Sequence, residues 1–377
     1  MSDVTIIGGG PVGLLLALRL HALGQVPRVI ERRVGPREGS RSIGVHPPSL
    51  ERLDRLGLGA RFTARGVRVR RGRAYLGARP LGVLDFGVCR GEHRYVLSIP
   101  QRDTERILRE ALEERSPGAL REGTELVDVE PGASAVRLRL RRDGTCFEED
   151  ARWVVGCDGR RSRVREACAI PVDVTEYPGR YAMFDAPDRT GLGEDAAIFL
   201  HSDGLVETFP LPGARRRWVV RRDADARGAS TQEELREAIE RRTGYLVRDV
   251  PDRASDFVTE RRFARRFAEG RVALVGDAAH VISPIGGQGM NLGWMGAWSL
   301  ASALGQARAL GPGRLRGDAI ARRRSARAAA RRAELDMWLG RPGASMARAR
   351  CVASLLKAPF DRALGRVFTM RGLAFGV

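Results

Sequence analysis

The sequence predicts an α/β fold, and three observations support this prediction. A buried strand at residues 3–8 leads through a glycine-rich turn into an apolar helix, and a second strand follows at 27–33, which is the order of a βαβ unit. Residues 133–157 and 196–223 alternate as further strands. Helical periodicity dominates from Gly289 onward, so we expect a sheet-rich body followed by helices. A length of 377 residues suits two domains and a short third element.

The remaining elements follow from local patterns. Helices with charged outer faces are predicted at 49–58 and 101–115, and a buried strand that runs into a loop is predicted at 271–280. The segment 314–349 is rich in arginine and alanine and reads as a helix that breaks at 340–343. We find no internal repeat.

Composition narrows the class of protein. Hydrophobic residues make up 43% and charged residues 29%, as in a folded globular protein, and no apolar run approaches the length of a membrane span. The chain opens directly into a strand without the pattern of a signal peptide, so we expect a cytoplasmic protein. The cysteines are too widely spaced for a CxxC motif, and we predict no disulfide and no metal site. They are Cys89, Cys146, Cys157, Cys168 and Cys351.

The formal net charge is +19, and Lys357 is the only lysine. A GC-rich genome explains the choice of arginine over lysine but not the excess of positive charge, which favours anionic partners such as cofactor phosphates or an acidic carrier protein. Aromatic residues are only 6% and scattered, so we predict no nucleic-acid partner. For the basic tail at 344–377, packing against the rest of the chain is favoured over membrane contact.

A dinucleotide fingerprint stands in the first βαβ unit. Gly8, Gly10 and Gly13 form a GxGxxG pattern, which is weak by itself but here follows a strand and opens a helix. Glycines permit the tight turn and the approach of a pyrophosphate, and Glu31 ends the next strand, where it can accept a ribose hydroxyl. The alternative is a glycine-rich turn without a ligand. The cofactor-binding residues predicted here are Gly8, Gly10, Pro11, Val12, Gly13, Glu31 and Arg32.

Two later motifs complete a set. They read GCDGRRSRVR at 156–165 and RVALVGDAAHVISPIGGQGMN at 271–291. With the first motif, and with SRSIGVHPPSLERLDRLGL and PQRDTERIL, they resemble the single-component (class A) FAD-dependent aromatic hydroxylases of the para-hydroxybenzoate hydroxylase type. The resemblance extends from the start of the chain to about residue 305.

The resemblance implies a domain layout. A Rossmann-like FAD-binding domain (GR2 type) would comprise 1–72, 96–176 and 265–305. An inserted β-sheet domain of 73–95 and 177–264 would bind the substrate, and 306–377 would form a C-terminal helical segment. We expect a monomer or a homodimer.

The resemblance also implies further FAD contacts. Asp158 and Gly159 would lie where FAD and the nicotinamide cofactor meet, and Asp277 would accept a ribityl or ribose hydroxyl. Backbone N–H groups of the glycine-rich turn at 286–289 would face the flavin ring. For Asp158 the alternative is a hairpin or capping residue, for Asp277 an N-cap of the following turn, and for Arg41 and Gln101 a solvated surface position. The residues assigned in this way are Arg41, Gln101, Asp158, Gly159, Gly276, Asp277, Pro284, Gly287, Gln288, Gly289, Met290 and Asn291.

One position departs from the family pattern. The family usually has an acidic residue where Gly296 stands, and that carboxylate helps to fix the helix after the third motif. Its replacement puts local rigidity and cofactor affinity in question.

The family's reaction gives the expected function. NADH or NADPH reduces FAD, O2 then forms a hydroperoxyflavin, and one oxygen atom is transferred to a phenolic or polyketide-like ring, as in antibiotic biosynthesis. Only one credible fingerprint is present, so the nicotinamide cofactor would bind transiently. Two alternatives stay open, a reductase of the geranylgeranyl-reductase type and a non-catalytic flavin-binding protein. A halogenase is disfavoured because Lys357 lies in no catalytic motif.

The substrate pocket is expected between the two domains. His46, Tyr181 and His201 are the candidate catalytic residues, and His46, Phe209, Trp218 and Pro284 are the candidate substrate contacts. His46 could deprotonate a phenol. Its alternative role is that of a packed histidine in a proline-rich turn.

Overall fold

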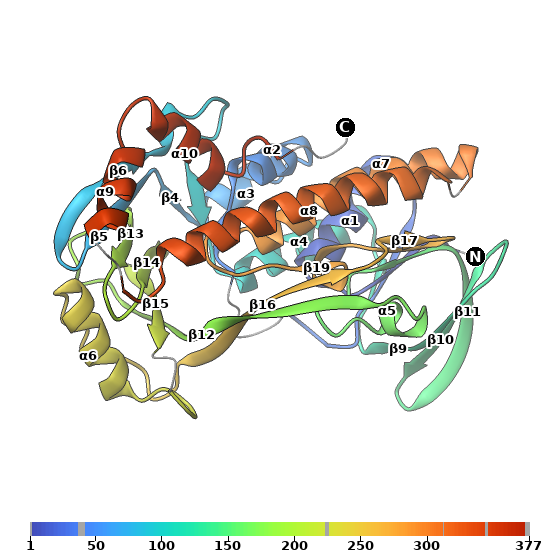
Figure 1. Cartoon of the computed structure of the whole chain (residues 1–377). Helices are drawn as coiled ribbons and strands as arrows, with labels where there is room; N and C mark the ends of the chain where they lie inside the picture. The colour runs from blue at the N-terminus through green and yellow to red at the C-terminus, as the bar shows by residue number, and fades with distance from the viewer. Residues whose placement is uncertain (1, 37–41, 223–225, 312, 344–345, 374–377) are drawn as a thin grey trace.

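The computed structural model describes residues 2–36, 42–222, 226–311, 313–343 and 346–373 (Figure 1). Its first sheet has eight strands, and β1, β2, β8, β11 and β18 within it are parallel neighbours. Strand β10 (Val136–Arg142) pairs antiparallel with β11, and β9 (Thr124–Pro131) pairs antiparallel with β10. The remaining strands, in spatial order, are β17 (Ala268–Glu269), β18 (Val272–Leu274), β11 (Thr145–Gly156), β1 (Ser2–Ile7), β2 (Pro27–Ile30) and β8 (Leu120–Arg121).

Helices cover both faces of the first sheet. On one face, Leu14, Ile107 and Leu300 join Ile6 and Val155 in a continuous buried core. On the other face, alanines of the long helix α8, among them Ala326 and Ala330, pack with strand residues. The helices of this region are α1 (Pro11–Ala22), α2 (Pro47–Arg55), α3 (Gly59–Thr63), α4 (Gln101–Arg115), α5 (Arg163–Ala167), α7 (Gly289–Leu310) and α8 (Gly313–Leu339).

A second eight-stranded sheet lies at the other end of the molecule. Strands β12 and β16 pair along most of their length and run from the first sheet toward the second (Figure 1). Helix α6 (Gln232–Thr243) covers one face of the second sheet. The spatial order is β19 (His280–Val281), β16 (Ser255–Ala264), β12 (Val172–Pro187), β15 (Arg215–Arg222), β14 (Val206–Leu211), β13 (Ala196–Leu200), β5 (Arg71–Leu76) and β6 (Arg79–Asp85).

Smaller elements close the structure. A three-stranded sheet holds β3 (Gly44–Val45), β7 (Val96–Ser98) and β4 (Val67–Val69), and η1 (Phe86–Val88) and η2 (Gly276–Ala278) are single 3₁₀ turns. Helices α9 (Met346–Leu355) and α10 (Phe360–Phe368) pack on β6 through Leu356, Leu364 and Phe368. The described part of the C-terminal region therefore packs on the protein, as the sequence favoured. No helix among the described residues is both long and apolar enough to cross a membrane.

Most predicted elements are confirmed, and one strand is shorter than predicted. The strand predicted to run into a loop within 271–280 is Val272–Leu274, and the backbone turns at Gly276 with a φ of +64°. The strand predicted at 27–33 ends at Ile30, since the N–H of Arg33 donates to the Glu31 carboxylate instead of to a neighbouring strand. The described cysteines are all free, as expected.

Candidate active site

The glycine-rich turn between β1 and α1 is tightly packed on one side and open on the other. A Cβ at Gly13 would lie 2.0 Å from the carbonyl oxygen of Gly8, and a Cβ at Gly8 would lie 2.5 Å from that of Cys157. A Cβ at Gly10 would meet no atom within 4 Å. Gly10 is the N-cap of α1 and offers no side chain to cap it, so the positive end of the helix faces open space.

Glu31 is buried and closes this turn. One carboxylate oxygen accepts from the N–H of Gly9 at 2.7 Å, and the other accepts from the N–H of Arg33 at 2.9 Å. Burial would raise the pKa of Glu31, but the hydrogen bonds from Arg33 and Gly9 outweigh it and hold the pKa below its ordinary value. Glu31 is therefore an anion that holds the turn, and its bond to a ribose stays a prediction. Arg32 beside it is exposed.

The third motif packs directly against the first. A Cβ at Gly276 would lie 3.2 Å from two methyl groups of Val12. Just after the motif, in α7, the indole N–H of Trp294 donates to the carbonyl of Pro11 at 2.9 Å. Asp277 is exposed although its neighbours in η2, Gly276 and Ala278, are buried. A carboxylate thus stands at the surface beside the N-terminus of α1, where it can accept hydroxyl groups.

The turn before α7 combines a glycine in the left-handed conformation with an unpaired amide side chain. Gly287 has a φ of +65°, and its N–H donates to the carbonyl of the exposed Pro284 at 2.9 Å. Both amide atoms of Gln288 are buried and have no hydrogen-bond partner among the described residues. Gly289 begins α7, and Met290 packs partly buried against the core.

Asn291 acts as a link between two backbone segments. Its Oδ1 accepts from the N–H of His46 at 2.9 Å, and its Nδ2 donates to the carbonyls of Gly44 at 2.8 Å and Gly287 at 3.1 Å. The side chain is fully buried and its amide is fully used. Asn291 therefore positions the turn at 284–288, and a direct contact with a cofactor stays a prediction.

His46 lies beside that turn and is buried. Its Nε2 is 3.8 Å from the position that a Cβ on Gly287 would take, and its Nδ1 is buried without a partner among the described residues. Burial lowers the pKa of His46 to about 4, although hydrogen bonds to the backbone of Phe368, Gly286 and Gly287 oppose the shift. The imidazole is thus neutral near pH 7. This favours a hydrogen-bonding role over strong base catalysis.

Asp158 and Gly159 lie at the end of β11, and the carboxylate caps α5. Oδ2 of Asp158 accepts from the N–H of Val164 at 3.1 Å, while Oδ1 is buried without a partner among the described residues. Burial raises the pKa of Asp158 despite hydrogen bonds from Ser162 and the backbone. Gly159 has a φ of +83°, which a side chain would strain.

Of the two FAD contacts that the resemblance implies between the first and second motifs, Arg41 and Gln101, the structure describes only Gln101. Arg41 lies outside the described residues. Gln101 begins α4 and donates from Nε2 to Glu105 at 2.9 Å, on its own helix. A residue that sequence reasoning missed is Arg109 of α4, whose guanidinium is close to the carbonyl of Gly9 at 3.4 Å and pairs with Glu122. It brings a cation to the glycine-rich turn.

The candidate substrate residues fall on two different faces of the second sheet. Tyr181 stacks on Phe257 at 5.5 Å, and partly buried Phe209 packs in the same cluster, which also holds Ile285 from the turn before α7. Trp218 belongs to the opposite face, under α6, where it packs near Tyr245. The structure therefore brings Tyr181 and Phe209 to the turn that carries Pro284, and it does not bring Trp218 there.

His201 lies apart from this cluster. It precedes the turn between β13 and β14, and its Nδ1 is near Ser202 at 3.3 Å and accepts from the N–H of Asp203 at 3.2 Å. Asp203 in turn accepts from Arg241 of α6 at 2.9 Å. These contacts place His201 at an outer turn of the second sheet, away from the glycine-rich turn.

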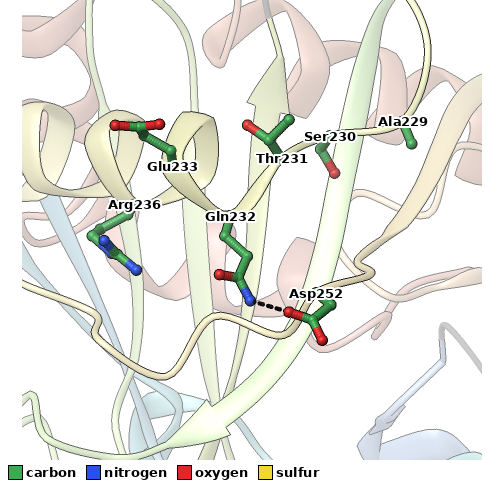
Figure 2. Close-up of a pocket in the computed structure, with 7 residues that line it drawn as sticks. All are labelled: Ala229, Ser230, Thr231, Gln232, Glu233, Arg236 and Asp252. Atoms are coloured by element: carbon green, nitrogen blue, oxygen red, sulfur yellow. Dashed lines mark hydrogen bonds between the residues drawn. The ribbon is translucent and has the colours of Figure 1, made fainter.

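Two hollows at the surface of the described structure lie away from the glycine-rich turn. One of about 580 Å³ stands at the start of α6, where Gln232 donates to Asp252 at 2.7 Å (Figure 2). The other, of about 280 Å³, lies among Arg160, Arg180 and Arg222. Both are lined by groups of mixed charge. An exposed trio of Asp54, Glu92 and His93 is the one group of possible metal ligands among the described residues, and no other observation there indicates an ion.

The chain is similar to known flavoproteins in sequence and in structure. A family model described as an FAD binding domain matches residues 1–333. Pentachlorophenol 4-monooxygenase of Sphingobium chlorophenolicum is 34% identical over 309 residues, which cover 79% of this chain and 57% of that protein. The anhydrotetracycline hydroxylase structure from Streptomyces rimosus superposes with a TM-score of 0.80 at 31% identity, over 100% of this chain and 77% of that one. The p-nitrophenol 4-monooxygenase structure from Pseudomonas putida superposes with a TM-score of 0.90 over 99% of both chains, and at 24% identity it shows the fold alone.

The chain belongs to the FAD binding domain family. The predicted fold class, a mixed α/β structure with helices toward its C-terminus, is confirmed. The chain spans little more than half the length of the first curated relatives, 57% and 55%.

The residues around the glycine-rich turn fit the chemical groups of FAD. FAD carries two phosphates, hydroxyl groups and a ring edge with alternating donors and acceptors. The open N-terminus of α1 at Gly10 suits the phosphates, and exposed Asp277 suits a hydroxyl. The unpaired buried amide of Gln288 would gain both a donor and an acceptor from the ring edge.

The FAD-binding domain also shows what replaces the usual acidic residue at Gly296. Gly296 lies against Arg322 of α8, whose guanidinium is almost fully buried. Arg322 pairs with Asp318 at 2.6 Å and donates to the carbonyl of Leu274, the last residue of β18, at 2.7 Å. Asp318 also accepts from Ser299 of α7 at 2.5 Å. An ion pair on α8 therefore ties α7 and β18 together without a carboxylate on α7.

Proposed function

We propose that this chain is an FAD-dependent monooxygenase that uses NADPH or NADH and O2 to hydroxylate an aromatic small molecule, phenolic or polyketide-like. The observation that carries the proposal is the meeting of the first and third motifs around the open N-terminus of α1. The monooxygenases among the relatives support it, including one named for pentachlorophenol and one named for 6-methylpretetramide.

In this proposal, the glycine-rich turn before α1 and the turn before α7 together bind and orient the cofactor. The N-terminus of α1 and the cation of Arg109 stabilise its phosphates, and Asp277 accepts a hydroxyl. The amide of Gln288 and the backbone of Gly287 hold the ring, and Asp158 and Gly159 border it. FAD bound there, once reduced by the nicotinamide cofactor, supplies the activation of O2 and the transfer of one oxygen atom to an electron-rich ring.

The substrate stands between the flavin and the second sheet in this proposal. Tyr181, Phe209 and Ile285 supply apolar and aromatic surface that packs on a ring and excludes water. Neutral His46 accepts or donates one hydrogen bond beside the turn at 284–288. The division into an FAD-binding domain and a substrate domain stays part of the proposal, and sheet membership changes within five residues of the predicted boundaries at 73 and 177.

An anaerobic titration tests the proposal. The purified, FAD-supplemented protein is titrated with NADPH or NADH, and loss of the oxidised-flavin absorption is followed with and without phenolic ligands. We expect bleaching that a ring ligand accelerates. If no ring ligand accelerates bleaching, but a prenyl substrate re-oxidises the reduced flavin, the protein would be a reductase. A yellow protein that neither nucleotide bleaches would indicate a flavin-binding role.

A further inference from the structure

The long helix α8 presents one continuous exposed face. Its buried positions face the core, and its exposed positions recur every three or four residues. Between residues 316 and 338 this face is about 33 Å long at 1.5 Å per residue. We call it the arginine face. Its large side chains are Arg316, Ile320, Arg324, Arg327, Arg331, Leu335 and Trp338.

The cations of this face have no partners in the described structure. Arg316, Arg324, Arg327 and Arg331 make no ion pair or hydrogen bond with any described residue. Other surface arginines are paired, for example Arg141 with Glu125 at 2.6 Å and Arg61 with Glu114 at 2.8 Å, so what distinguishes the arginine face is that its unpaired cations follow one another along a single helix. Like charges one turn apart repel each other, so a partner that neutralises them gains Coulomb energy.

Apolar side chains flank the cations. Ile320 is 49% exposed on one side, and Leu335 and Trp338 are 56% and 46% exposed on the other. Arginine and tryptophan are the residues that most often dominate protein interfaces. A basic centre with apolar ends along one helix is the complement of an acidic helix that carries apolar residues at its ends.

We propose that the arginine face docks an acidic protein partner, through carboxylates that pair with Arg324, Arg327 and Arg331 and apolar contacts to Leu335 and Trp338. A second copy of this chain with the two-fold axis across this face does not fit, because it would set arginines against arginines. A lipid surface fits less well, since the face is only one helix wide. The narrow face and its charged centre indicate a transient complex that weakens with salt.

The C-terminal end of the arginine face lies next to the candidate substrate cluster. The buried side chain of Met337, next to Trp338 in the chain, packs in the same cluster as Tyr181 and Ile285. A partner docked at Leu335 and Trp338 would thus stand beside the candidate substrate cluster, where a carrier protein could present a tethered substrate. This placement rests on the proposed function, while the docking itself does not.

A binding experiment on the full chain tests the proposal. The probe is a fluorescent helical peptide with glutamates at one-turn spacing and a leucine at each end, followed by anisotropy at low and at physiological salt. The variant is Arg324→Glu with Arg327→Glu and Arg331→Glu. The control reverses Arg137, Arg139 and Arg141 on the exposed face of β10 and changes the net charge equally.

The proposal predicts at least a tenfold rise in Kd for the α8 variant and less than a threefold rise for the β10 control. A second variant, Leu335→Ser with Trp338→Ser, should also weaken binding without any change in charge. Equal losses in the two charge variants would overturn the proposal. Tighter binding of anionic vesicles or duplex DNA than of the peptide, with the same dependence on α8, would also overturn it. Flavin content, measured alongside, reports on the proposed function separately.

Discussion

The two glycines at the start of α1 predict opposite results for the same substitution. Gly13→Ala would place a Cβ 2.0 Å from the carbonyl oxygen of Gly8, so helix and turn must separate by about 1 Å to reach the 3.0 Å that real Cβ atoms respect. We expect a loss of about 3 kcal/mol in the free energy of unfolding, as in an overpacked core. Gly10→Ala meets no atom and keeps a common backbone conformation, so it should cost about 1 kcal/mol or less.

Gly10→Ala, which should leave stability nearly unchanged, should weaken the binding of FAD. The added methyl group at residue 10 would occupy the space in which the phosphates of FAD approach the backbone. An overpacking cost of about 1–3 kcal/mol there raises the Kd for FAD about 5-fold to 150-fold. The measurements are thermal unfolding of the apoprotein by circular dichroism and quenching of FAD fluorescence. Wild-type FAD affinity in Gly10→Ala would refute the proposed binding mode, as would an apoprotein destabilised as much as Gly13→Ala.

Three further changes probe other parts of the account. Asp277→Ala should weaken FAD binding, measured by quenching of FAD fluorescence, and unchanged flavin occupancy would remove Asp277 from the site. Arg322→Met should lower the free energy of unfolding by about 3 kcal/mol in urea denaturation because it leaves Asp318 buried and unpaired, and a neutral result would mean that the ion pair does not hold α7. Between pH 6.5 and 4, His46 is protonated in the unfolded chain but stays neutral in the folded protein, because burial lowers its pKa to about 4. His46 alone should therefore lower the free energy of unfolding by about 3 kcal/mol as the pH drops through this window. Burial also lowers the pKa of His280, to about 3, and this adds a similar slope. His46→Gln should therefore reduce the slope without abolishing it, and an unchanged slope would show that His46 is not one of its sources.

The sequence could predict elements whose periodicity is unambiguous. Helix α4 has the predicted bounds 101–115, and the hairpin of β10 and β11 turns at Asp143 and Gly144 as expected. Strand ends were less predictable, because Glu31 and Gly276 redirect the backbone through a side-chain hydrogen bond and a positive φ. Neither effect changes the hydrophobic pattern.

The candidate site was predictable where a motif fixes backbone geometry. The glycines of the first motif are placed by steric limits that the pattern encodes. The pocket was harder, since both faces of the second sheet are buried and the strands lack the polar alternation that would separate Trp218 from Tyr181. Arg109 and Arg322 act through long side chains that reach other elements, which periodicity does not reveal.

The origin of the transferred oxygen tests the central claim most directly. The protein is loaded with FAD and supplied with NADPH, heavy-oxygen-labelled O2 and a panel of phenols and polyketide-like rings, and the products are analysed by mass spectrometry. The account predicts a hydroxylated ring that carries one labelled oxygen atom for each NADPH oxidised. Hydroxyl oxygen that comes from water, or label recovered entirely as hydrogen peroxide with every ring in the panel, would contradict it.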